Sequence, residues 1–209
     1  MTSDLNIVFE IVCLATAVLF LRNVSGIFTF FTIVYLLIVC STEIAGGIWT
    51  SRFGTSNSWI YNIFIIYEAA YISFGLYVAL KGLTKRAYQY CSIAFMGFLV
   101  TYGYELSSQS FFKFNSKTVL VFSILFSFNC FTYFYLLIKD KNTINLKQNG
   151  QFWWVAGVYA YYFGGTIYNL FLQQSSYPYI ILSYTMILLN LILYGFWSYS
   201  FICNSRQQK

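Results

Sequence analysis

The chain has 209 residues and a mass of 24.3 kDa, and most of its side chains are apolar. Hydrophobic residues make up 59%, aromatic residues 23% and charged residues only 9%, with a mean hydropathy of +0.64. A soluble domain carries about 25% charged residues. The composition therefore predicts an integral membrane protein whose first partner is the lipid bilayer. The net charge of +6 comes from basic residues that set the orientation of a protein in the membrane and attract anionic lipid. We do not expect a nucleic-acid partner.

Several classes of chemistry are excluded by residue type. The chain contains no histidine, so haem ligation by His, His-based zinc sites and Ser-His-Asp triads are impossible. No glycine-rich phosphate-binding sequence is present. The cysteines occur singly in apolar stretches, which is typical of small packing residues: Cys13, Cys40, Cys91, Cys130 and Cys203. We therefore predict no catalytic residue, no metal site and no cofactor, and a protein that is not an enzyme.

Seven apolar stretches follow one another along the chain, each close to the length of about 17–25 residues that crosses a bilayer as a helix. Because backbone polar groups must be satisfied within the membrane, these stretches must be helical. The predicted fold is an all-α bundle of seven transmembrane helices forming a single domain over residues 1–209. The spans cover roughly 5–22, 26–50, 58–80, 86–107, 117–138, 152–173 and 178–203.

The basic residues predict the orientation of the bundle. One set of connections holds Arg22, Lys81, Lys85, Arg86, Lys139, Lys141, Lys147, Arg206 and Lys209, while the other holds only Arg52, Lys113 and Lys117. Short loops rich in Lys and Arg stay in the cytoplasm. We therefore expect a multi-pass cell-membrane protein with its amino terminus outside and its carboxyl terminus in the cytoplasm. The membrane is expected to be the inner membrane of a bacterium.

Polar residues in the first four spans predict a pocket inside the bundle. A charged carboxyl at mid-depth costs at least about 2.5–3.5 kcal/mol, so each should face the interior or water. Glu10 lies in span one and Glu43 late in span two, followed by the small residues Gly46 and Gly47. In span three, Tyr61, Glu68 and Tyr71 recur at helical spacing, and Glu105 ends span four.

We predict that these residues line an outward-facing pocket for a ligand or an ion. Its expected members are Glu43, Glu68, Tyr61, Tyr71, Glu10, Glu105, Asn62 and Asn190. Counting inward from the short loop after span two also places Glu43 and Glu68 at similar depths, so we expect them to form a carboxyl pair. The alternative is that the glutamates and asparagines only join the helices by hydrogen bonds, worth about 0.6–2 kcal/mol each.

Short motifs resemble a family of small seven-helix membrane proteins common in Bacteroidota. They are Glu43, the run Asn57 to Phe64 followed by Glu68, Phe152-Trp153-Trp154 with Gly157, Tyr161, Gly164 and Gly165, and Asn190 followed by Phe201-Ile202-Cys203. The resemblance implies a sensory or accessory membrane role. A retinal protein is rejected, because the seventh span contains no lysine to form a Schiff base.

Three functions remain open on the sequence alone. The first is a receptor-like or accessory protein that binds a ligand in the outer pocket and signals to a partner chain, which would be another membrane protein or a cytoplasmic one. The second is a structural or assembly subunit of a larger membrane complex. The third is a proton- or cation-coupled transporter that uses the same glutamates, although the inner halves of the spans carry few polar groups.

Overall fold

The computed structural model describes residues 2–21, 26–140, 145–172 and 179–207, and its regular structure there is helical throughout. The helices are α1 (Thr2–Leu21), α2 (Ile27–Phe53), α3 (Ser58–Leu80), α4 (Ala87–Ser108), α5 (Ser116–Lys139), α6 (Gly150–Leu172) and α7 (Tyr179–Gln207), with the 3-10 helix η1 (Leu146–Gln148) before α6. The predicted all-α fold is confirmed, and each predicted span coincides with one helix to within a few residues. The predicted end positions 22, 173 and 178 lie outside the described residues.

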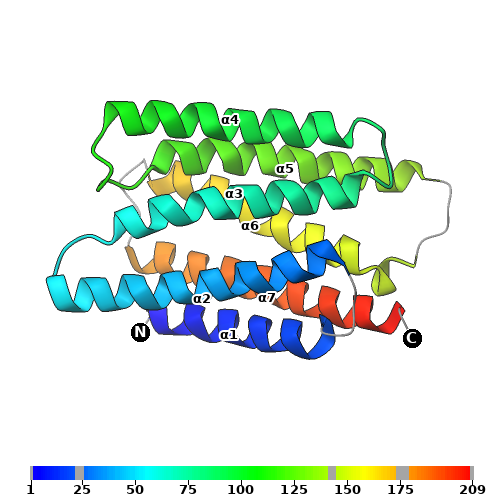
Figure 1. The fold of residues 1–209 in the computed structure, drawn as a ribbon, viewed down its shortest axis with the longest axis horizontal. Helices are drawn as coiled ribbons and strands as arrows, with labels where there is room; N and C mark the ends of the chain where they lie inside the picture. The colour runs from blue at the N-terminus through cyan, green and yellow to red at the C-terminus, as the bar shows by residue number, and fades with distance from the viewer. Residues whose placement is uncertain (1, 22–25, 141–144, 173–178, 208–209) are drawn as a thin grey trace.

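The helices run alternately in opposite directions between two ends of an elongated bundle (Figure 1). The first end carries the start of α1 and the α2–α3 and α4–α5 connections. The second end carries the α3–α4 connection and the last turn of α7. Helices α1, α2, α3, α5, α6 and α7 contact one another in a closed ring, α3 also meets α6 across it, and α4 packs outside against α3 and α5.

Four helices are long and apolar enough to cross a membrane: α2, α3, α5 and the Ser183–Gln207 part of α7. Leu5–Leu21 of α1 is apolar but shorter. Helices α4 and α6 have suitable lengths, but Tyr, Trp, Gly, Ser and Thr lower their hydropathy. This supports the membrane assignment. The number of crossings and the orientation stay predictions.

Helix α2 runs three residues beyond the predicted position 50 and ends at Gly54. Gly54 has a φ of 62°, and its N–H donates to the carbonyl of Thr50 at 3.0 Å. A left-handed residue at this place stops a helix, and only glycine adopts it without strain. The extra turn makes α2 overhang the start of α3 at the first end (Figure 1), and this sets the register of the two helices.

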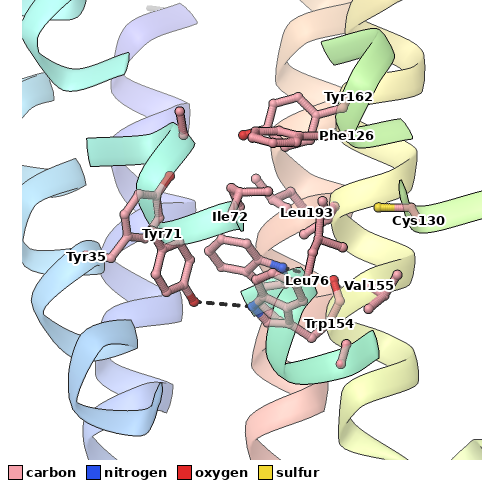
Figure 2. Close-up of a cluster of buried hydrophobic side chains, with 14 of the residues drawn as sticks. Tyr35, Tyr71, Ile72, Leu76, Phe126, Cys130, Trp154, Val155, Tyr162 and Leu193 are labelled. Atoms are coloured by element: carbon pink, nitrogen blue, oxygen red, sulfur yellow. Dashed lines mark hydrogen bonds between the residues drawn. The ribbon is translucent and has the colours of Figure 1, made fainter. Parts of the chain in front are cut away.

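An aromatic cluster joins α2, α3, α6 and α7, and consists of Tyr35, Tyr71, Trp154 and Trp197. The Tyr35 and Tyr71 rings stack with centroids 4.1 Å apart, and the Trp154 and Trp197 rings stack at 5.6 Å. Trp154 Nε1 donates to Tyr71 Oη at 3.3 Å (Figure 2), and Trp197 Nε1 donates to the carbonyl of Trp154 at 3.2 Å. Both indole N–H groups and the Tyr71 hydroxyl thus have hydrogen-bond partners inside the bundle, as buried amphipathic aromatics require.

Gly75 allows this cluster to pack against α3. A methyl group at position 75 would overlap the six-membered ring of Trp154. We expect the overpacking caused by Gly75→Ala to cost about 1–3 kcal/mol. Alanine returns only up to ~1 kcal/mol through its higher helix propensity, so the variant should be less stable than the wild type. The unfolding temperature in detergent measures the effect. Gly47→Ala is the matched control, because nothing lies within 4 Å of its added methyl group; equal unfolding temperatures for the two variants would contradict the prediction.

Candidate functional site

Glu43 lies where α2 and α3 meet near the first end. Tyr61 Oη donates to Glu43 Oε2 at 3.0 Å, and Asn57 Nδ2 donates to the carbonyl of Gly46 at 3.2 Å. A Cβ at position 46 would lie 3.0 Å from Asn57 Nδ2 and 3.2 Å from Tyr61 Oη. Glycine at this position therefore lets both side chains of α3 reach α2. Gly46 thus permits a close approach of the two helices, whereas Gly47 faces open space.

Glu68 is held by a residue far away in the sequence. Tyr162 of α6 is buried, and its Oη donates to Glu68 Oε1 at 2.8 Å. The Tyr162 ring is fixed edge-on against Phe122 and Phe126, with centroids 5.5 Å away in each case; Figure 2 shows it beside Phe126. A rigid phenol thus presents its hydroxyl to the half-buried Glu68 carboxyl across the ring of helices.

Glu10 of α1 is the most buried of these three carboxyls, with 3% of its surface exposed. It interacts with the hydroxyl of Tyr194 on α7 and electrostatically with Glu43. Its Oε2 atom has no hydrogen-bond partner among the described residues. A buried carboxyl oxygen without a donor is costly, so this atom is free to accept a hydrogen bond from a ligand.

Tyr161 of α6 is within electrostatic range of all three carboxyls. It interacts electrostatically with Glu68, Glu43 and Glu10, and Tyr35 interacts with Glu68 and Glu10. We call the group of Glu10, Glu43 and Glu68 with the phenols Tyr61, Tyr161, Tyr162 and Tyr194 the carboxyl site. It is built by α1, α2, α3, α6 and α7. The Lys and Arg residues that the structure describes lie at helix ends or in connections, so none of them neutralises the carboxyl site from within a helix.

The predicted close pair of Glu43 and Glu68 is not supported by the register of the helices. Tyr61 lies beside Glu43, and Glu68 follows Tyr61 by seven residues, which is about 10 Å along the helix at ~1.5 Å per residue. The overhang of α2 causes the difference from the sequence count. Each carboxyl has its own phenol, and the carboxyl with which Glu43 interacts is that of Glu10.

Asn62 binds backbone groups of the α4–α5 connection. Its side chain is fully buried, and Nδ2 donates to the carbonyls of Phe111 at 2.8 Å and Lys113 at 2.7 Å. Its Oδ1 accepts the N–H of Asn115 at 3.1 Å. The amide thus uses its groups to hold this connection against α3, which is a structural role.

Glu105 caps helix α5. Its carboxyl oxygens accept the backbone N–H groups of Lys117 at 3.1 Å and Thr118 at 2.8 Å, together with the hydroxyl of Thr118 at 2.7 Å. A carboxylate suits this place because the first N–H groups of a helix have no partner within the helix and carry partial positive charge. The geometry therefore gives Glu105 a structural role away from the carboxyl site.

Tyr71 and Asn190, the remaining predicted pocket residues, lie beside the carboxyl site rather than in it. The Tyr71 hydroxyl interacts with Thr32 Oγ1 at 3.0 Å and with Trp154, so it belongs to the aromatic cluster, which adjoins the carboxyl site through Tyr35. Asn190 is half-buried and lies one helical turn before Tyr194, on the same face of α7.

The phenols of α6 and α7 were not among the predicted site residues. Tyr161 and Tyr162 belong to the run Tyr159–Phe163, which is almost entirely aromatic, and nothing in that run shows which ring meets a carboxyl. Tyr194 lies four residues after the predicted Asn190, so helical spacing is the only signal that indicates it.

Comparisons with family models, curated proteins and solved structures found no match to this chain. The resemblance to seven-helix proteins of Bacteroidota therefore stays a prediction. Among the described residues, no three Cys, Asp or Glu side chains lie close enough together to hold a metal ion. The carboxyl site is consequently better suited to an extended organic ligand or to protons than to one ion bound by all three glutamates.

The capping role of Glu105 has a measurable consequence. We expect Glu105→Ala to destabilise the protein by about 1–3 kcal/mol, because three donors at the start of α5 lose their acceptor. Thr132→Ala on the same helix is the control, since its hydroxyl bonds only within the helix, to Phe128. Thermal unfolding in detergent compares the two variants. An unchanged unfolding temperature for Glu105→Ala would show that the cap does not stabilise α5.

Proposed function

We propose that the chain is a receptor-like or accessory protein of the bacterial inner membrane that crosses it seven times, with its first end outside. Three observations support seven crossings: the alternating directions of the helices, four helices of sufficient length and hydropathy, and three more of membrane-spanning or nearly membrane-spanning length. The described basic residues favour the second end as the cytoplasmic one. It carries Lys81, Lys85, Arg86, Lys139, Lys147 and Arg206, against Arg52, Lys113 and Lys117 at the first end.

The orientation is tested with reporters. A reporter fused after Lys209 should be active in the cytoplasm, and one inserted at Gly54, in the α2–α3 connection, should be active outside. The physical reason is the asymmetry of Lys and Arg between the two ends. Reversed signals would place the carboxyl site in the inner half of the membrane and overturn the outward-facing pocket.

The carboxyl site carries the functional proposal. The single deciding observation is that Glu68 lies inside the bundle on the hydroxyl of Tyr162, with Glu43 and the buried Glu10 on neighbouring helices, while the described Lys and Arg residues lie only at helix ends or in connections. A cationic group within hydrogen-bond reach would offset the cost of burying carboxylates. We infer that the ligand is a small organic molecule with an amine or several hydrogen-bond donors, long enough to reach more than one carboxyl.

Signalling would require a partner. The described connections between helices are short, and the longest, residues 140–149, holds only the short helix η1 within its described part. The proposal therefore includes another membrane protein or a cytoplasmic protein that receives the signal. If no ligand binds, the alternative of an assembly subunit, in which the glutamates contribute only to packing, is favoured.

Ligand binding is tested by thermal stabilisation of the purified protein in detergent, with a panel of aliphatic mono-, di- and quaternary amines. At least one amine should raise the unfolding temperature in a concentration-dependent way. Glu68→Gln should fold normally but lower the affinity for that amine by about ten-fold or more. The amide of glutamine still accepts the hydrogen bond of Tyr162 but carries no charge.

Two tyrosine variants separate the site from general packing. Tyr162→Phe removes the hydroxyl that holds Glu68 and should weaken binding of the same amine. Tyr104→Phe, on an exposed tyrosine of α4, should leave its binding unchanged. If no amine stabilises the protein, or if Glu68→Gln binds as well as the wild type does, the carboxyl site is not a receptor site for cations.

A proton- or cation-coupled transporter is the second candidate, favoured by a cavity at the second end. This cavity of about 120 Å³ has a mixed lining, in which the polar side chains are Thr29, Thr32, Gln151, Ser200 and Asn204 and the others are mainly apolar. It is built by the same five helices as the carboxyl site, so polar groups lie on both sides of the aromatic cluster. If the second end is cytoplasmic, these polar side chains lie in the inner halves of the spans, where the sequence indicates few polar groups.

Transport is distinguished from binding in liposomes. If the second candidate holds, reconstituted protein should carry protons, or protons with sodium or potassium, across the membrane, and Glu68→Gln should abolish this flux. Fluxes equal to those of empty liposomes would exclude proton, sodium and potassium transport but leave amine binding intact.

A further inference from the structure

A deep groove lies on the outer surface of the bundle between α2 and α3. It has a volume of about 870 Å³, within the range of about 300–1,000 Å³ that is usual for small-molecule sites. Its lining is almost entirely apolar and includes Phe28, Phe31, Tyr35, Tyr71 and Phe74. Both helices are long and apolar enough to span the membrane, so the groove faces the hydrocarbon rather than water.

The length of the groove matches one leaflet of a bilayer. Along α2 its lining runs from Ile27 to Ile38, which is about 16 Å at ~1.5 Å per residue. The hydrocarbon of a bilayer is about 30 Å thick, so each leaflet contributes about half of that. A single lipid chain lying along the groove would therefore extend from the second end of the bundle to the middle of the membrane.

A cation lies at the second-end limit of the groove. Lys81 follows the last residue of α3, is exposed, and is the only basic residue among the described residues of the lining. Lys85 and Arg86 follow four and five residues later in the α3–α4 connection and are also exposed. An apolar groove one leaflet long with an ammonium group at its surface end is complementary to an anionic phospholipid, since the chain is apolar and the phosphate is negative.

We propose that this α2–α3 groove binds one anionic phospholipid, with an acyl chain on the aromatic floor and the phosphate at Lys81. The floor includes Tyr35 and Tyr71, which belong to the aromatic cluster, so a bound chain would contact the packing between the two ends of the bundle. The proposal rests on the protein spanning the membrane and is independent of the carboxyl site.

The test is native mass spectrometry of the full chain in detergent, titrated with phosphatidylglycerol and with phosphatidylcholine of the same acyl chains. The wild type should retain one phosphatidylglycerol at concentrations where phosphatidylcholine is lost. Lys81→Gln should reduce the preference about five-fold, the contribution of one lysine near a membrane surface. Lys147→Gln, an exposed lysine of η1 at the same end, is the matched control and should keep the full preference.

A variant that fills the groove tests its apolar part. Ala70→Phe places a ring in the groove and should abolish retention of both lipids, whereas Ala45→Phe, at an exposed position of α2 outside the lining, should not. If Ala70→Phe lowers the unfolding temperature, Val34→Phe from the opposite wall takes its place. Equal retention of the two lipids by the wild type, or lipid retention unaffected by filling the groove, would overturn the proposal.

Discussion

The structure depends on how three carboxyl groups are accommodated among helices that carry no internal cation. An ionised carboxyl at such depth is expensive unless it is paired or hydrogen-bonded. Phenols meet this constraint here: Tyr61 donates to Glu43 and Tyr162 donates to Glu68. Phenols suit a bundle in lipid because their rings pack like other apolar groups while their hydroxyls remain donors. Tyr61 and Tyr162 therefore serve both as packing groups and as the donors that two of the glutamates need.

The same constraint decides which helices meet. The bond from Tyr162 to Glu68 joins α6 to α3 across the ring, and the bond from Tyr61 to Glu43 fixes the register of α3 on α2. The amide of Asn62 and the carboxyl of Glu105 then hold the α4–α5 connection at the first end. Polar side chains thus specify the arrangement, whereas apolar packing alone gives little preference among lipid-embedded helices.

The helices were predictable because hydrophobic length and interrupting charges are local features of the sequence. The bounds of α3 agree with the predicted span 58–80, and the clearest difference is the extra turn of α2, which ends at the left-handed Gly54. The inward orientation of Glu43 and Glu68 was also predictable, since carboxyls in apolar helices must face the interior or water. The burial of Glu10 was not, because its position in the first turns of α1 is close enough to the membrane surface for water to reach it.

Partners from distant segments could not be predicted in the same way. Glu68 and Tyr162 are 94 residues apart, and several other tyrosines of α6 have the same local character. The capping role of Glu105 depends on where the α4–α5 connection places Thr118, which spacing alone does not show. Hydropathy predicts the helix to which a residue belongs and its approximate depth in the membrane. Which of several similar side chains it contacts depends on three-dimensional packing.

The aromatic cluster limits how the two ends of the bundle can influence each other. Tyr35 interacts with Glu68 and stacks on Tyr71, which accepts the hydrogen bond of Trp154, a residue that lines the cavity at the second end. Close-packed rings do not deform gradually, so a change in the carboxyl site reaches the second end only if these rings change their arrangement together. Both proposed functions require such a change, as a signal in a receptor and as an opening in a transporter. Because the α2–α3 groove shares Tyr35 and Tyr71 with the cluster, a chain lying in it would favour whichever arrangement of the rings leaves the groove open.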